Sequence, residues 1–212
     1  MLDFFAGSST TAHAVLAQNI ADGGRRRFIM VQLDEKPAPK SEAAKAGYAT
    51  IAELSRERIR RGARKALESA GLASEGFDAG FRTLMVDSTN LADVLRTPDE
   101  TDQQELAGLE DNIKIGRSGQ DLLFQVLLDW GLEMSLPIAV ELVEGREVFV
   151  VDEGALVACF DDEVTPELVR ALSELQPLRA VFRNSRFASD DARINAEQIF
   201  NELSPSTEVK AI

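Results

Sequence analysis

The residues best suited to chemistry lie in the first dozen positions, where an apolar strand runs directly into a turn of small side chains. The turn is Gly7-Ser8-Ser9-Thr10-Thr11, and its first three residues let a ligand approach the main chain because their side chains are so small. A helix is predicted to begin at Thr10, where the first N–H groups lack internal partners and carry the positive end of the helix dipole. This turn therefore suits a carboxylate, a phosphate or the edge of a ribose.

Carboxylates stand at the ends of both predicted strands of this region. Asp3 ends the first strand and supplies an acceptor for an amine or a hydroxyl. Residues 28–33 form the kind of short apolar run expected for a buried parallel strand, and they are followed by Asp34 and Glu35. An acid there lies beside the first turn and can accept both hydroxyls of a ribose. The order of strand, small-residue turn, helix, strand and acid predicts a cofactor site. The alternative is a tight corner followed by a solvated acidic loop.

A strongly basic helix is predicted over residues 51–70, ending at Gly71. Six basic residues fall within ten positions of it: Arg56, Arg58, Arg60, Arg61, Arg64 and Lys65. Such a cluster can contact a phosphate backbone such as that of DNA. It is equally typical of a solvated face or of one that neutralises an acidic partner surface, and the sequence does not separate these interpretations.

Composition favours one large or two small domains with real cores, because 44% of the 212 residues are hydrophobic. The net charge of −13 argues against a protein that coats nucleic acid along its whole length. The charge is unevenly divided, because residues 1–72 carry a net +4 and residues 73–212 a net −17.

The single Cys159 excludes a disulfide framework and is predicted to be buried. Neither a signal peptide nor an apolar run of membrane-spanning length is found, so we expect no membrane association and a cytoplasmic location.

The remainder reads as a linker over residues 72–80 and a second, smaller α/β domain over residues 81–212. Strands are predicted at 81–86, 138–143, 148–151, 155–160, 180–182 and 207–212, and a long surface loop at 87–116. Helices are predicted to begin at a capping box at Ser118, at Pro166 and near Ser189. Neither a catalytic triad nor a metal cluster is found there, and Trp130 is expected in the core.

Two motifs resemble those of a known enzyme class. Residues 2–14 resemble the first cofactor motif of the β-class amino-methyltransferases of DNA, and residues 28–35 resemble the second. More specifically, the chain resembles the modification subunit of type III restriction-modification systems, which are adenine-specific enzymes that use S-adenosyl-L-methionine. The segments that carry this likeness are 51–61, 154–161, 179–183 and 195–200. The resemblance implies a truncated, Rossmann-like methyltransferase segment over residues 1–71, followed by the C-terminal α/β domain.

The resemblance also implies roles for individual residues. Asp3, Phe5, Gly7 and Ser9 would surround the methionine part of the cofactor. Glu35, alone or with Asp34, would hold its ribose, and Ser8, Thr10 and Thr11 complete the expected cofactor-binding set. Ser9 stands where the family usually has Gly, so we expect weakened cofactor binding.

The family's catalytic Pro-Pro motif comes before the cofactor motif, and no two prolines are adjacent in this chain. We therefore expect the C-terminal part of such an enzyme, inactive alone, and we assign no catalytic residue. The resemblance implies DNA, a restriction subunit and a second copy of the chain as partners. Two alternatives stay open: a non-catalytic assembly module acting through residues 81–212, and an unrelated nucleotide-binding α/β protein.

Overall fold

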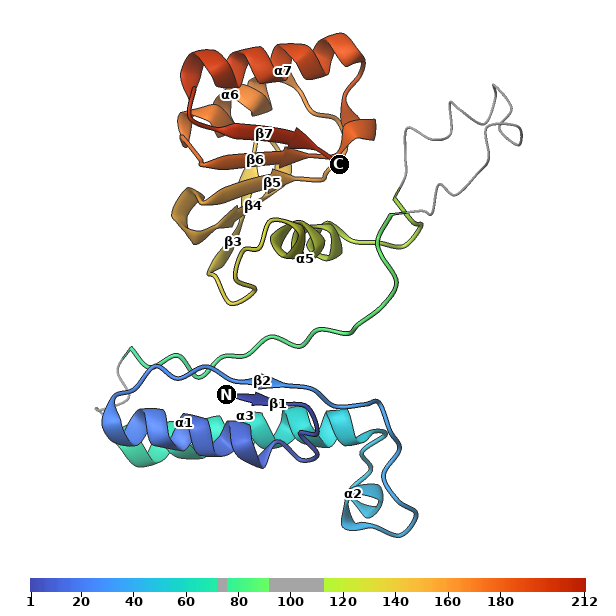
Figure 1. Ribbon diagram of the computed structural model, residues 1–212, viewed down its shortest axis with the longest axis vertical. Coiled ribbons are helices and arrows are strands. Elements are labelled where there is room, and N and C mark those ends of the chain that lie inside the picture. Colours follow the sequence, from blue (N-terminus) through green and yellow to red (C-terminus); the bar gives the residue numbers. More distant parts are fainter. Residues whose placement is uncertain (72–75, 92–112) are drawn as a thin grey trace, which may run out of the picture. The chain divides into compact units, whose positions relative to one another are not determined.

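Two separate bodies organise the chain: unit 1 comprises Met1–Thr83 and unit 2 comprises Leu84–Ile212 (Figure 1). The computed structural model describes residues 1–71, 76–91 and 113–212. Part of the predicted linker, 72–75, and most of the predicted loop, 92–112, lie outside the described residues.

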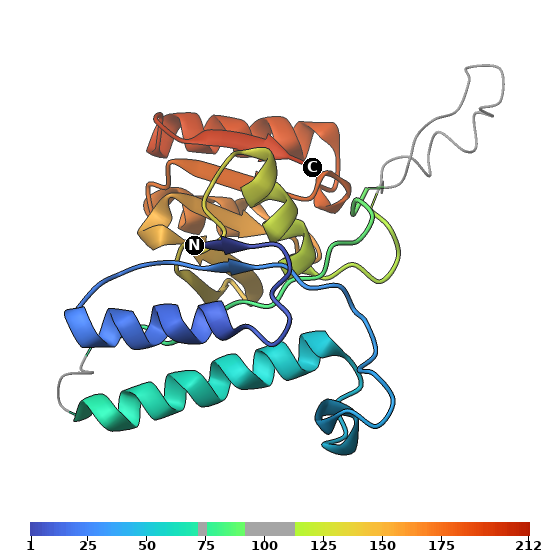
Figure 2. The same ribbon diagram turned by 60° about the horizontal axis from the view of Figure 1, so that its bottom comes forward.

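Unit 1 is built on a strand–helix–strand segment followed by a long helix. Its elements are β1 (Leu2–Asp3), α1 (Thr10–Asp22), β2 (Ile29–Met30), α2 (Glu42–Lys45) and α3 (Ile51–Ala70). The two strands are parallel, with Leu2 beside Ile29. Helices α1 and α3 lie side by side, as Figure 2 shows, and their contact buries Ala12, Leu16 and Ile59.

Local signals explain where these helices begin and end. Helix α1 ends where Gly23 adopts a left-handed conformation, which glycine tolerates without a steric penalty. Helix α3 begins at Thr50, whose hydroxyl accepts a hydrogen bond from the N–H of Glu53, and ends before Gly71, as predicted. Helix α1 begins at Thr10, as predicted.

The strands of unit 1 are shorter than predicted. Only Ile29 and Met30 of the run 28–33 form a strand, because the partner strand β1 itself has only two residues. The strand predicted at 81–86 is wrong: these residues are irregular, and the side chains of Met85 and Val86 are largely exposed. Among the described residues of the predicted linker, Phe77 and Ala79 pack against the unit 1 core, and Phe81 does so as well.

Unit 2 is a mixed five-stranded sheet with helices on both faces, which confirms the predicted α/β class (Figure 1). The elements are α5 (Gly119–Asp129), β3 (Ile138–Val143), β4 (Arg146–Val151), η4 (Asp152–Gly154), β5 (Leu156–Cys159), α6 (Pro166–Glu174), β6 (Arg179–Phe182), η5 (Asn184–Arg186), α7 (Asp190–Leu203) and β7 (Glu208–Ala211). The strands lie in chain order; β3 to β5 are antiparallel, and β5 to β7 are parallel. One core lies between the sheet and helices α6 and α7, and the other lies beneath α5.

Two residues singled out in unit 2 have structural roles. Cys159 is buried in β5, as predicted, and burial raises the pKa of its thiol. Trp130 packs partly buried against the core beneath α5, and the cations of Arg179 and Lys210 lie 5.1 and 4.8 Å from its ring centroid.

Candidate cofactor-binding turn

The turn between β1 and α1 is held by hydrogen bonds from its backbone N–H groups to the segment after β2. The N–H of Ala6 donates to the carbonyl of Val31 at 3.1 Å, and the N–H of Gly7 donates to Gln32 Oε1 at 2.7 Å. Gly7 and Ser9 both have left-handed backbone conformations, with φ values of 52° and 57°. The chain therefore reverses over very few residues and reaches the start of α1 immediately.

Asp3 shapes this turn from its first residue. Its Oδ1 accepts a hydrogen bond from the N–H of Phe5 at 3.1 Å, and its Oδ2 accepts one from Thr11 Oγ1 at 2.8 Å. Both carboxylate oxygens are thus engaged inside the turn. Asp3 connects the end of β1 to the first turn of α1 and fixes the conformation of the residues between them.

Ser9 faces the protein interior. Its side chain is fully buried, and its hydroxyl forms a hydrogen bond with that of Ser55 on α3. The hydroxyl that distinguishes Ser9 from the glycine usual in the family is therefore directed into the contact between the turn and α3. The left-handed φ at this position is one that glycine adopts easily, which gives a physical reason for the glycine usual in the family.

Helix α3 contributes a second contact, at the tip of the turn. Arg58 Nη1 donates a hydrogen bond to Ser8 Oγ at 2.9 Å, and Ser8 Oγ lies 3.4 Å from Thr10 Oγ1. Arg58 was grouped with the basic residues of α3 on sequence grounds, and Ser55 was not singled out. Their partners lie 50 and 46 residues away, so no local signal relates them to the turn.

The two acids after β2 are exposed and stand apart from these contacts. Among the described residues, neither Asp34 nor Glu35 forms an ion pair through its carboxylate. The main chain nevertheless fixes their segment, because the carbonyl of Glu35 accepts the N–H of Ile51 at 2.8 Å. Phe5 is also free of the core, with 90% of its surface exposed. The structure thus joins Asp3 and residues 7–11 in one hydrogen-bonded turn and leaves the side chains of Phe5, Asp34 and Glu35 exposed.

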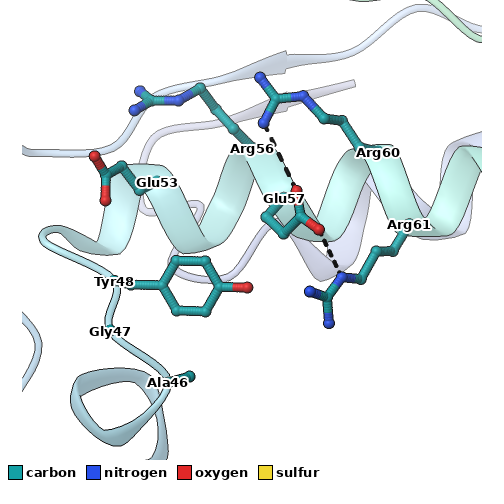
Figure 3. A pocket seen from close by; sticks show the side chains of 8 residues that line it. All are labelled: Ala46, Gly47, Tyr48, Glu53, Arg56, Glu57, Arg60 and Arg61. Carbon is teal, nitrogen blue, oxygen red and sulfur yellow. Dashed lines mark hydrogen bonds and ion pairs between the residues drawn. The ribbon is translucent and has the colours of Figure 1, made fainter.

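The basic residues of α3 do not share one environment. An open hollow of about 500 Å³ lies between α3 and the segment after α2, and Figure 3 shows Tyr48 and Glu57 in it. It is lined by Ala46, Gly47, Tyr48, Glu53, Arg56, Glu57, Arg60 and Arg61. Glu57 accepts a hydrogen bond from Arg61 at 2.7 Å, which lowers the pKa of its carboxyl, and lies 3.8 Å from Arg60. Arg64 and Lys65 lie exposed further along the helix.

Two further sequence expectations concern metals and membranes. His13 lies in the contact between α1 and α3, against Gly62, and the part of the chain that the structure describes holds no group of three side chains suited to a metal ion. Of the described helices, none has the length and apolar character needed to cross a bilayer.

Comparison with known proteins relates the chain to restriction-modification enzymes. No protein-family model matches it. It is 51% identical over 82 residues to the Mod subunit of the type III restriction-modification enzyme StyLTI of Salmonella typhimurium, covering 39% of this chain and 12% of that subunit. It is 51% identical over 65 residues to the EcoP15I Mod subunit of Escherichia coli, covering 31% of this chain and 10% of that subunit.

A third relative belongs to another type of system. It is the type II methyltransferase M.KpnI of Klebsiella pneumoniae, 39% identical over 59 residues, which cover 28% of this chain and 14% of that protein. The chain thus spans only a small part of the length of each relative. Over up to two fifths of its own length, it is homologous to the modification subunits of type III restriction-modification enzymes, which confirms the resemblance inferred from its motifs.

Proposed function

We propose that this chain carries the S-adenosyl-L-methionine-binding segment of a site-specific adenine DNA methyltransferase. The observation that carries the proposal is the turn at residues 7–11, held open by Asp3, Gln32 and Ser55. A turn of this kind after a parallel strand is a common place for a nucleotide-like ligand. The homologous modification subunits and methyltransferase support this choice of ligand.

The space beside the turn fits close approach of a ligand to the main chain. A Cβ atom built on Gly7 would meet no neighbouring heavy atom nearer than the carbonyl oxygen of Phe5, at 3.9 Å. The N–H groups of Thr10 and Thr11 begin α1 and have no partner within the helix. Glu35 and Asp34, exposed after β2, are the acids that would bind the ribose hydroxyls.

The cofactor supplies a methyl group that is activated for transfer to the exocyclic amine of adenine. The target base is flipped out of the duplex because its amine is unreachable within the stack. The residues of this chain contribute binding and orientation, which lower the barrier by fixing the reacting geometry. No group that would polarise the amine is assigned among them, so we expect the chain to be inactive alone.

Equilibrium titration tests the proposal. S-adenosyl-L-methionine and NAD are titrated separately into the full chain by calorimetry, and only the first is expected to bind. Equal binding of NAD would favour an unrelated nucleotide-binding protein, and binding of neither would contradict the proposal.

A matched pair of variants then locates the binding site. Gly7→Ala places a side chain on a left-handed residue at the turn, and Gly23→Ala does the same at the far end of α1. We expect the first to weaken binding by at least tenfold and the second to leave affinity unchanged, because Gly7 lies in the turn whereas Gly23 lies at the C-terminal end of α1. Equal effects of the two variants would argue against a site at the turn.

DNA and a restriction subunit are the partners that this function implies. Arg56, Arg60 and Arg61 line the hollow beside α3 and would contact phosphates, so the affinity for DNA should fall steeply with salt. Substituting all three with Gln should reduce the slope of log affinity against log salt by about two to three units, as measured by fluorescence anisotropy.

A second candidate function, assembly without catalysis, is favoured by the edge of the unit 2 sheet. Among the described residues, β3 pairs only with β4, and Val140 and Leu142 on it are 59% and 80% exposed. An apolar edge strand readily pairs with another chain. A stable dimer of the chain in sedimentation experiments, dissociated by Leu142→Lys and accompanied by no cofactor binding, would favour this function.

A further inference from the structure

Arg58 differs from the other basic residues of α3 because its side chain is directed at the turn. Its Nη1 lies 2.9 Å from Ser8 Oγ, in a partly buried contact. Ser8 itself stands between the two left-handed residues of the turn, Gly7 and Ser9. The guanidinium thus reaches the tip of the turn from a separate helix.

The position of Arg58 is fixed by its own helix. Ser55 precedes it by three residues, on the neighbouring turn of α3, and is joined to Ser9 by a buried hydrogen bond. Residues on two successive helical turns of α3 therefore contact Ser8 and Ser9, which are adjacent in the turn between β1 and α1. Such anchoring limits the rotation of α3 and keeps the charge of Arg58 at one place.

The charge of Arg58 is not neutralised within the described residues. Arg61 pairs with Glu57 and Arg26 pairs with Asp22, whereas the Ser8 hydroxyl is the partner found for Arg58. The carboxylate of Asp3 at the same turn is occupied by Phe5 and Thr11. A guanidinium has five N–H donors in a planar fork that matches a carboxylate, and one of the five binds Ser8.

We infer that Arg58 is a ligand-binding residue of the turn and that its guanidinium binds the carboxylate of the methionine part of S-adenosyl-L-methionine. This inference rests on the proposed function and adds to it the group that recognises the amino-acid end of the cofactor. It assigns Arg58 to the cofactor and the remaining basic residues of α3 to another surface.

The test compares two ligands that differ only at this end. S-adenosyl-L-homocysteine carries the amino-acid carboxylate, whereas 5′-methylthioadenosine keeps the adenosine and the sulfur but lacks the amino acid. Each is titrated into the full chain, into Arg58→Gln and into Arg25→Gln. Arg25 is an exposed arginine beyond the opposite end of α1, so this control removes the same charge far from the turn.

We expect Arg58→Gln to weaken the binding of S-adenosyl-L-homocysteine by roughly tenfold to a hundredfold, the usual effect of losing a charged hydrogen bond. The affinity for 5′-methylthioadenosine should be unchanged, and Arg25→Gln should alter neither. Arg58→Lys should recover part of the loss, because it keeps the charge without the fork. This variant also serves if Arg58→Gln is poorly folded.

Two results would overturn the inference. If Arg58→Gln weakens the binding of both ligands equally, Arg58 merely holds Ser8 in place. If it weakens the binding of neither, Arg58 does not contact the ligand. Failure of the unsubstituted chain to bind either ligand would instead contradict the proposed function itself. The ratio of the two affinities therefore tests the role of Arg58, whereas binding of either ligand to the unsubstituted chain tests the proposed function.

Discussion

Ser9 combines a left-handed backbone with a completely buried hydroxyl. A residue with a Cβ is strained in this conformation by roughly 1–2 kcal/mol. The hydrogen bond to Ser55 offsets part of that strain, because it pairs two buried hydroxyls across the contact between the turn and α3. The side chain at this position therefore matters first to the stability of the turn.

We predict that Ser9→Ala destabilises unit 1 by about 2 kcal/mol, because it leaves the Ser55 hydroxyl buried without its partner and retains the strain. Ser9→Gly should cost about 1 kcal/mol less, because glycine tolerates the left-handed backbone. Urea unfolding followed by circular dichroism measures both. Equal losses for the two variants would show that the backbone of Ser9 is not strained.

The turn could be predicted from its residues, but the contacts that hold it could not. Gly7, Ser8 and Ser9 are recognisable because small residues between a strand and a helix permit a tight turn. Gln32 stood out weakly in the sequence, as the polar residue in an apolar run. Its side chain accepts a hydrogen bond from the N–H of Gly7. Arg58 carried a misleading signal, because its neighbours in the sequence are also basic.

At the scale of elements, the contact between α1 and α3 depends on Gly62. A Cβ atom there would lie 2.7 Å from His13 Cδ2, closer than any real contact allows. We predict that Gly62→Ala destabilises unit 1 by about 1–2 kcal/mol, because the clash outweighs the gain in helix propensity. In a His13→Ala background the same change should become neutral or stabilising in urea unfolding. An equal loss in both backgrounds would mean that His13 is not the obstacle.

The capping box of α5 makes the stability of unit 2 depend on pH. The backbone N–H and hydroxyl of Ser118 donate hydrogen bonds to Asp121, and they lower the pKa of its carboxyl below the ordinary value of 3.8. A group with a lowered pKa in the folded state stabilises it above the ordinary pKa. That contribution is lost as the pH falls through the folded value.

We predict that Asp121→Asn costs unit 2 about 1 kcal/mol at neutral pH, because the capping box is weakened. The variant should also lose less stability than the unsubstituted chain when the pH falls from about 5 to 3. Fluorescence of Trp130, which ends α5, follows the unfolding at each pH. Parallel losses in the two proteins would exclude Asp121 as a source of the pH dependence.

Elements with a local cap or turn were predicted accurately, and those that need a distant partner were not. Helix α5 was recognised from its capping box, and the strands predicted at 138–143 and 148–151 form the antiparallel β3–β4 pair. The strand expected at 81–86 failed because apolar residues form a strand only where another strand pairs with them. Local chemistry fixes the ends of an element, whereas pairing depends on the rest of the fold.

At the scale of the whole molecule, the two units differ in how well their sheets are covered. The unit 2 sheet has helices on both faces, whereas among the described residues the helices of unit 1, α1 and α3, pack on one face of the β1–β2 pair. On its other face Leu2, Phe4 and Ile29 are 51%, 62% and 64% exposed. Parallel sheets are usually covered on both sides, so this apolar surface is unusual for a folded domain.

We predict that Ile29→Lys reduces the binding of a hydrophobic dye and raises the solubility of the chain, with little change in the stability of unit 1. Met30→Lys is the matched control, because Met30 is the next residue along β2 and its partly buried side chain packs against the core formed by α1 and α3. It should destabilise unit 1. Solubility and dye fluorescence that respond alike to the two variants would contradict this description of the sheet.

The burial of Cys159 has a consequence for how unit 2 can be observed. As the one thiol of the chain, lying in the middle strand of the sheet, it can react with a thiol reagent only when that strand is exposed. The rate of labelling under native conditions therefore reports the opening of the sheet, with no probe introduced. Unit 1, which has no cysteine, does not react with the thiol reagent and does not contribute to the measurement.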